Sequence, residues 1–235
     1  LVGYWDVDAP ATLERVCGNP GDRFRAFIPR YDFVYTYGGG DPVVRGYRAL
    51  GAARCAPIYN ALDPTTHFPV PPVPRYACDL ALLANRLPDR EERIGAFFLD
   101  AARRLPESSF LLGGNGWEGS GLPENVRAIG HLPTAEHNAF NCSPAAVLNV
   151  SRDSMARFGF SPATRVFEAA GAGACLITDA WEGIELFLEP GSEILVAQDG
   201  ADVARHVHEL TADPERARRI GDAARRRVQI GRAHV

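Results

Sequence analysis

The chain has 235 residues, more than one domain of about 100–200 residues needs but short for two full doubly wound domains. Hydrophobic residues make up 46% and charged residues 23%, a composition that excludes a disordered chain. The net charge is -4, and no basic run marks a nucleic-acid surface in the first two-thirds of the sequence. No apolar run approaches the roughly 20 residues of a membrane span, and no signal peptide opens the chain, so we expect a cytoplasmic protein.

The residue types that could hold ligands are unevenly represented. All 25 basic residues are arginine, so guanidinium groups or backbone amides must hold any anionic ligand. The five cysteines are scattered without a Cys-x-x-Cys pair, which favours small buried residues over a disulfide framework or a zinc site. The six histidines contain no His-x-x-x-His pair, and we expect neither a bound metal nor a resident cofactor.

Short apolar runs alternate with helical patterns from the start of the chain, which predicts βαβ units and a mostly parallel sheet. In the first unit we predict strands at Leu1–Asp6, Phe33–Tyr37 and Cys55–Tyr59, and helices at Ala11–Cys17 and Pro42–Leu50. Five prolines between Leu62 and Pro74 predict a linker, so the domains are expected at 1–70, hinge included, and at 71–229. The first strand has no leading loop, and we expect the first domain to be incomplete.

The second unit is more regular and predicts a doubly wound α/β domain. Its predicted strands are Ala77–Leu83, Phe110–Gly113, Val126–Gly130, Ala145–Val150, Ala174–Thr178 and Glu193–Ala197. Its predicted helices are Glu91–Arg104, Thr134–Asn141, Pro162–Ala172, a short one near Ile184–Leu188, and a long helical tail from Ala201. The last six residues, Ile230–Val235, match what a sequencing adapter would encode, and we expect an artefactual end there.

Candidate anion ligands follow the first strand of the second unit. Arg86 and Arg90 lie in the loop before the helix, where a helix amino terminus also favours an anion and guanidinium groups suit a diphosphate. The alternative is surface ion pairs with neighbouring acids such as Glu91, which are common and weak. Sequence position alone leaves both interpretations open.

A second candidate segment precedes the helix predicted from Pro162. Ser161 can cap that helix or leave its free amides to hold phosphate. Arg165 and Glu168 follow within the first turns, and a carboxylate at Glu168 can accept hydrogen bonds from both hydroxyls of a ribose. The next strand leads into Asp179, in a loop on the same ligand edge.

In the first unit, Asp6 and Asp8 end a strand at its ligand edge, where aspartates can orient or deprotonate an acceptor hydroxyl. For Asp8, capping of the helix near Pro10 is the favoured alternative. The run Gly38–Asp41 lacks the lysine and the spacing of a P-loop.

Several segments together resemble the group-1 glycosyltransferases, which have the GT-B fold of two Rossmann-like domains. Ile58–Pro64, followed by His67-Phe68-Pro69, resembles their interdomain hinge, with Ala61 in place of a glycine. Asn85-Arg86-Leu87 with Arg90 resembles the diphosphate-binding segment, and Phe158–Gly173 is similar to the donor-site helix. Thr178–Gly183 and Phe187–Glu193 are similar to the CgeB-like branch, named for spore-maturation proteins. The resemblance spans nearly everything from Tyr4 to Val228.

The resemblance implies a bacterial hexosyltransferase-like enzyme, truncated at its amino terminus, that moves a sugar from a nucleoside diphosphate sugar to an unknown glycan, protein or small-molecule acceptor without metal. Arg86 and Arg90 would hold the diphosphate, Glu168 the ribose, and His131 would lie near the base or the sugar. Phe160 takes the place of the family's first glutamate, so no catalytic role can be carried over from that carboxylate. The alternatives are a sugar-phosphate epimerase of the same architecture and a non-catalytic protein that binds nucleotide sugars.

Overall fold

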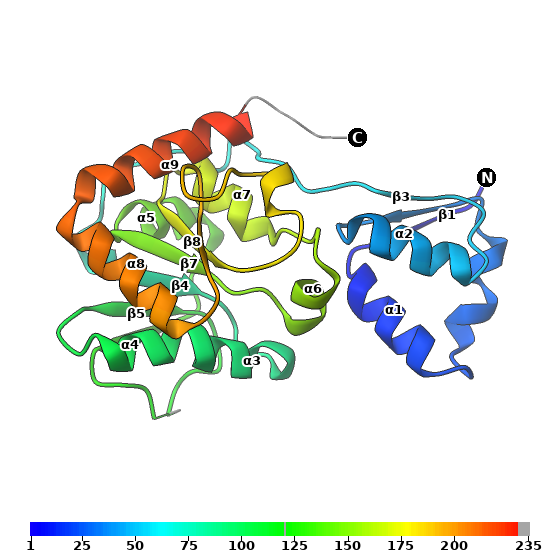
Figure 1. Cartoon of the computed structure of the whole chain (residues 1–235), viewed down its shortest axis with the longest axis horizontal. Helices are drawn as coiled ribbons and strands as arrows, with labels where there is room; N and C mark the ends of the chain where they lie inside the picture. Colours follow the sequence, from blue (N-terminus) through cyan, green and yellow to red (C-terminus); the bar gives the residue numbers. More distant parts are fainter. Residues whose placement is uncertain (120, 230–235) are drawn as a thin grey trace.

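A computed structural model describes residues 1–119 and 121–229 of the chain. The expected artefactual end at Ile230–Val235 lies outside the described residues. The described residues form two lobes, each built on its own parallel sheet (Figure 1). Among the described residues, no helix is both long and apolar enough to cross a membrane.

The smaller lobe has a three-stranded sheet in the order β1-β2-β3, all parallel. Its elements are β1 (Gly3–Asp6), α1 (Ala9–Gly18), β2 (Phe33–Thr36), α2 (Gly40–Ala49) and β3 (Cys55–Pro57), with 3-10 turns η1 (Arg23–Ala26) and η2 (Ile28–Arg30) before β2. Its core contains Leu13, Val34 and Tyr47. The predicted strands and helices of this lobe are confirmed within about one to two residues at most ends.

The larger lobe has a six-stranded parallel sheet in the order β6-β5-β4-β7-β8-β9. Its strands are β4 (Leu80–Leu83), β5 (Phe110–Gly113), β6 (Val126–Gly130), β7 (Ala146–Asn149), β8 (Leu176–Asp179) and β9 (Leu195–Ala197). The predicted strands β5 and β6 are confirmed at both ends. The chain builds outward from β4 in one direction, then returns and builds outward from β7 in the other, so the strand order reverses between β4 and β7.

Helices cover both faces of the larger sheet. They are α3 (Pro88–Ile94), η4 (Gly95–Leu99), α4 (Asp100–Arg104), α5 (His137–Cys142), α6 (Asp153–Phe158), α7 (Thr164–Gly171), α8 (Gly200–Ala212) and α9 (Pro214–Gln229), with 3-10 turns η3 (Pro74–Tyr76), η5 (Thr134–Glu136) and η6 (Ile184–Leu186). Strand residues alternate between the faces: Leu80 and Leu82 pack in one core, Ala81 and Leu83 in the other. All four are buried, because a parallel sheet covered on both sides needs apolar residues throughout.

Two helices differ from their sequence predictions. The helix predicted at Glu91–Arg104 is continuous but passes through a π-helical turn at Gly95–Leu99, where Phe97 and Phe98 are buried in the core. The tail predicted from Ala201 breaks at Asp213, and α9 begins with Pro214 at its first position. The six-residue helix α6 was not predicted.

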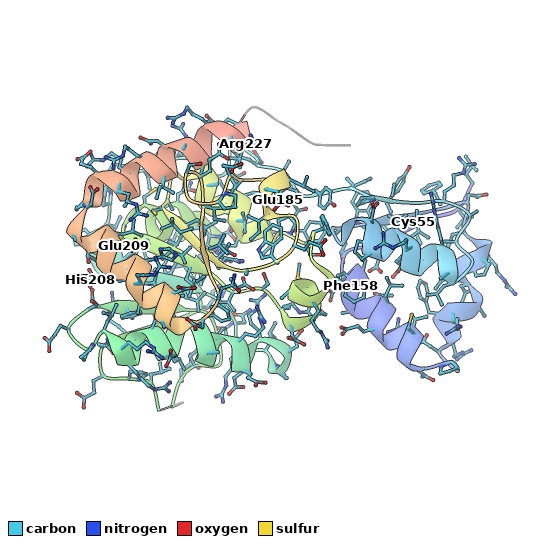
Figure 2. The ribbon with its side chains drawn as sticks, in the orientation of Figure 1. Cys55, Phe158, Glu185, His208, Glu209 and Arg227 are labelled. Atoms are coloured by element: carbon cyan, nitrogen blue, oxygen red, sulfur yellow. The ribbon has the colours of Figure 1, made fainter. Side chains whose placement is uncertain are left out.

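The two lobes meet through α6 and the loop after it. Phe158, at the end of α6, packs against the core of the smaller lobe, and Figure 2 shows it where the lobes join. Residues 58–73, between β3 and the 3-10 turn η3, form neither helix nor strand. The predicted linker lies in this segment, and the domain boundaries stay a prediction.

Candidate functional site

A cavity of about 410 Å³ opens at the carboxyl ends of β4 and β7, where the strand order reverses. Open α/β sheets bind their ligands at this position, because the loops there diverge to opposite faces and leave a crevice. The larger lobe supplies the whole described lining. Its polar lining residues are Asn85, Arg90, His131, Thr134, His137, Asn149, Thr164 and Arg165.

Two guanidinium groups face this cavity, and each has a nitrogen that makes no hydrogen bond among the described residues. Arg90 lies in the first turn of α3, and Arg165 lies in the first turn of α7. Burial lowers the pKa of both, and the charges of Arg152 and Arg165 lower that of Arg90 further, while Glu168 opposes the shift at Arg165. Nε of Arg90 and Nη1 of Arg165 are buried without a hydrogen-bond partner among the described residues. A dianionic ligand between them would relieve both the desolvation and the mutual repulsion.

The amino terminus of α7 adds a third source of positive potential. The helix begins at Thr164, and its opening N–H groups have no intrahelical acceptors, as at every helix start. Thr164 and Arg165 both line the cavity, so the positive end of the helix dipole lies at its wall. Two guanidinium groups and a helix amino terminus therefore line the same cavity and give it a positive electrostatic potential.

The prediction that Ser161 caps this helix is wrong. The helix starts two residues later than Pro162, its N-cap residue is Ala163, and the Ser161 hydroxyl donates to the carbonyl of Gly159 at 2.8 Å. Contacts with the smaller lobe explain the later start: the Gly39 N–H donates to the Phe160 carbonyl at 2.8 Å, and the Tyr37 hydroxyl donates to the Pro162 carbonyl at 3.1 Å. The segment before Thr164 is therefore held outside the helix. Ser161 is buried in the wall behind it.

Glu168 lies one turn into α7, beside the cavity, among three cationic or ionisable groups. Its Oε2 is 3.4 Å from Arg165 Nη1 and 3.5 Å from His137 Nδ1, and its Oε1 is 3.9 Å from His67 Nε2. Burial alone would raise the pKa of Glu168, but His137, Arg165 and His67 lower it below its usual value. Oε2 of Glu168 and Nδ1 of His137 are buried without a hydrogen-bond partner among the described residues. An ionised carboxylate in this state can accept hydrogen bonds from ligand hydroxyls.

The other candidates from the second unit lie in different surroundings. His131 lines the cavity beside Leu132. Arg86 pairs with Glu91 at 2.6 Å and stacks on Trp117 at 5.9 Å from the ring centre, so the surface-pair interpretation describes its present contacts. Arg86 is outside the cavity lining that the described residues form.

Asp179 lies behind the cavity and is fully buried. Its Oδ1 accepts hydrogen bonds from the N–H and hydroxyl of Ser151, and its Oδ2 accepts one from Arg93 at 2.6 Å. These contacts occupy both oxygens. Asp179 orders the turn after β7, and a direct contact between Asp179 and a donor would require this network to rearrange.

The two candidate aspartates of the first unit are both engaged. Asp6 is buried and accepts hydrogen bonds from the Tyr47 hydroxyl, the Thr12 hydroxyl and the N–H of Asp8. Asp8 stands at the N-cap position of α1, but its side chain makes no capping hydrogen bond there. The favoured capping role is therefore wrong. Asp8 instead accepts a hydrogen bond from Arg152 of the larger lobe at 2.7 Å.

Several residues of the site were missed by sequence reasoning. His137 and His67 come from α5 and from the linker, and they reach Glu168 only through the packing of these segments on α7. Asn149 is the last residue of the buried strand β7 and donates a hydrogen bond to Thr178 at 3.1 Å, so its surroundings are those of a core strand residue. A polar residue at the last position of a buried strand was the one available signal.

A protein-family model matches this chain in sequence, and solved structures match it in fold. The model of the glycosyl transferase-like family matches residues 90–234. No curated protein sequence matches the chain. Among solved structures, sucrose-phosphate synthase from Thermosynechococcus elongatus has a TM-score of 0.72 at 17% identity, over 97% of this chain and 63% of that one.

Two further similar structures were solved with a nucleotide sugar. HepE from Anabaena, in complex with UDP-glucose, has a TM-score of 0.66 at 14% identity, over 96% of this chain and 68% of that one. The BGT protein of phage T4, in complex with its UDP-glucose substrate, has a TM-score of 0.63 at 13% identity, over 84% of this chain and 58% of that one. This chain thus spans about 63% of the synthase's length. At these identities the likeness shows the fold, and the predicted α/β fold of GT-B type is confirmed.

Proposed function

The chain belongs to the glycosyl transferase-like family, and from this premise we propose that it transfers a hexose-like sugar from a nucleoside diphosphate sugar to an acceptor. The donor diphosphate lies between Arg90, Arg165 and the amino terminus of α7. The observation that carries this proposal is the pair of buried, incompletely partnered guanidinium groups on the wall of one cavity at the reversal of strand order. Arginines that only solubilise the protein would be exposed, whereas each of these guanidinium groups has a buried nitrogen without a hydrogen-bond partner among the described residues.

In this arrangement the leaving diphosphate gains negative charge as the sugar bond breaks. Preorganised donors that lie where this charge develops stabilise the transition state, and Arg90, Arg165 and the α7 amides supply them without a metal ion. Glu168 accepts hydrogen bonds from the ribose hydroxyls, and His131, which lines the cavity, contacts the base or the sugar. The acceptor, a glycan, a protein or a small molecule, approaches from the smaller lobe.

A second candidate, binding of a nucleotide sugar without turnover, has a specific observation in its favour. Asp6 and Asp8 are both occupied by hydrogen bonds, and Phe160 stands where the family's first glutamate is expected. Both oxygens of the buried Asp6 are engaged, so Asp6 is not available as a proton acceptor in this conformation, and Oδ2 of Asp8 is engaged by Arg152. Donor binding with no release of nucleoside diphosphate, in the presence of any acceptor tested, would select this alternative.

A titration of nucleotides and their sugars tests the proposal. UDP, GDP, ADP and CDP are titrated by calorimetry, followed by UDP-glucose as the first sugar, because two structural relatives were solved with it. We expect one diphosphate to bind at least about tenfold more tightly than its monophosphate, because the second phosphate adds charge-assisted hydrogen bonds. Arg157→Gln, a change at an exposed pair far from the cavity lining, is the matched control. Equal affinities for mono- and diphosphates would exclude a diphosphate site.

A further inference from the structure

Hydrogen bonds to the buried carboxylate of Asp6 hold the turn that carries Asp8. Asp6 Oδ1 accepts hydrogen bonds from the Asp8 N–H at 3.0 Å and the Thr12 hydroxyl at 3.1 Å, and the Tyr47 hydroxyl donates to Asp6 Oδ2. Burial and the carboxylate of Asp6 raise the pKa of Tyr47, so its hydroxyl stays protonated and keeps donating. The buried Asp6 thus holds Asp8 in a set position on the side of the smaller lobe that contacts Arg152 of the larger lobe.

Arg152 contacts Asp8 from a turn whose backbone is also held by hydrogen bonds. Ser151, its neighbour, donates its N–H to Asp179 and accepts a hydrogen bond on its carbonyl from Arg93 Nε at 3.1 Å. Arg93 in turn donates to Asp179, which closes a buried ring of contacts at the ends of β7 and β8. The guanidinium of Arg152 therefore projects from an anchored backbone.

One guanidinium joins three parts of the molecule. Arg152 Nη1 donates to Asp8 Oδ2 at 2.7 Å, and its Nε donates to Asp89 Oδ2 at 2.5 Å. Asp89 lies in the first turn of α3, directly before Arg90 of the cavity wall. Burial alone would lower the pKa of Arg152, but its bonds to Asp89 and Asp8 raise it, so the group carries its charge throughout. The chain Asp8–Arg152–Asp89 links the smaller lobe to the helix that carries the cavity's Arg90.

We propose that Asp8 and Arg152 are positioning residues, which fix the acceptor-facing edge of the smaller lobe against α3 and the donor cavity. The proposal rests on the proposed function and assigns to Asp8 a role different from proton acceptor. Oδ2 of Asp8 accepts a charge-assisted hydrogen bond from Arg152, which holds the Asp8 carboxylate against the larger lobe. Alignment of two reacting groups is worth a large factor in rate, and small displacements reduce it steeply.

The contact itself is tested without any ligand, by the distance between spin labels on the two lobes. One label is attached to the exposed Cys17 and the other to Arg103→Cys on the larger lobe. Asp8→Asn and Arg152→Gln are each expected to lengthen or broaden the distance distribution. Arg152→Lys, which keeps the charge but loses the planar fork of donors, is expected to give a smaller effect. Arg157→Gln, which removes the exposed pair with Glu14 at 2.6 Å between the same lobes, is expected to leave it unchanged. If Asp8→Asn and Arg152→Gln both keep the wild-type distribution, the proposal is overturned whether or not a nucleotide binds.

The positioning role is tested with UDP and UDP-glucose as probes. Asp8→Asn and Arg152→Gln should each slow UDP release from UDP-glucose by about tenfold, with no further loss in the double variant and with UDP affinity within about threefold of wild type for Asp8→Asn. The pH dependence of the rate should keep its wild-type shape. If Asp8→Asn removes the rise of rate with pH while Arg152→Gln leaves the rate intact, Asp8 is a base and the proposal fails. If the wild type binds none of the diphosphates, the proposed function fails, and the label distances alone decide the contact.

Discussion

Neutralising Arg90 is expected to stabilise the ligand-free protein while it weakens nucleotide binding. Arg90 is half-buried, its buried Nε lacks a hydrogen-bond partner among the described residues, and Arg152 and Arg165 add repulsion that Asp89 and Asp179 offset in part. Replacing a buried, poorly compensated charge by a neutral side chain is stabilising, here by about 1 kcal/mol, which is about 2–4 °C in melting temperature for a chain of this size. A lost charge-assisted hydrogen bond to phosphate costs about 1.5–3 kcal/mol, so Arg90→Gln should bind UDP roughly tenfold to hundredfold more weakly.

The matched control is Arg93→Gln, in the next turn of the same helix. Arg93 is paired with the fully buried Asp179 at 2.6 Å, so its removal leaves an uncompensated buried carboxylate and should cost about 3 kcal/mol of stability. Thermal unfolding and calorimetric titration with UDP are measured on wild type and both variants. The two arginines should therefore shift the melting temperature in opposite directions. A lower melting temperature with unchanged UDP affinity in Arg90→Gln would refute the diphosphate assignment.

Three further outcomes depend on single side chains. Glu168→Gln should weaken UDP binding by roughly tenfold to hundredfold, because a charged acceptor for two hydroxyl groups is lost. The preference of the wild type for UDP over 2′-deoxy-UDP should shrink in the variant, because one of these two hydroxyl groups is absent from the deoxy ligand. Folding lowers the pKa of Glu168, so the ionised Glu168 contributes its full stabilisation at pH values above the pKa that this residue has in the unfolded chain. That stabilisation is lost as the pH falls through the lowered pKa. Unfolding free energies measured across the acid range should show this loss in the wild type and not in Glu168→Gln. Gly183→Ala should lower the free energy of unfolding by about 1–2 kcal/mol more than Gly191→Ala, measured by chemical denaturation. Both glycines have a φ near +85°, but a new Cβ at Gly183 would meet the Phe160 ring, whereas one at Gly191 would meet open space. Equal losses of stability would show that the ring moves away freely.

The strands were the most predictable part of the molecule. Runs such as Leu80–Leu83 and Phe110–Gly113 are buried at every position, and four consecutive apolar residues between turn signals have few other places in a soluble fold. Helix ends depended on tertiary contacts and were predicted less well. The start of α7 moved from Pro162 to Thr164 because two carbonyls before it accept hydrogen bonds from the smaller lobe.

The position of the cavity was also predictable from the sequence, because it follows from the order of the strands in the sheet. Loops after β4, β6 and β7 converge on one edge, and Arg90, His131 and Arg165 line the same cavity although 75 residues separate the first from the last. Which atoms of these loops face the cavity was not predictable. Arg86 and Arg90 have the same residue type and lie in the same loop and helix start, yet one pairs with Glu91 at the rim and the other is buried in the wall.

Phe160 shows why the remainder of the site needed the structure. It is the one described residue other than glycine with a positive φ, at +47°, a conformation that costs a bulky residue about 1–2 kcal/mol. Local propensity would place glycine or asparagine there. Its ring instead packs against Gly40 of the smaller lobe and Gly183 of the larger one, and a Cβ at Gly40 would lie 2.7 Å from the ring. Two distant glycines therefore make room for the ring, and a backbone conformation that is unfavourable in isolation is held by contacts from both lobes just before α7 begins.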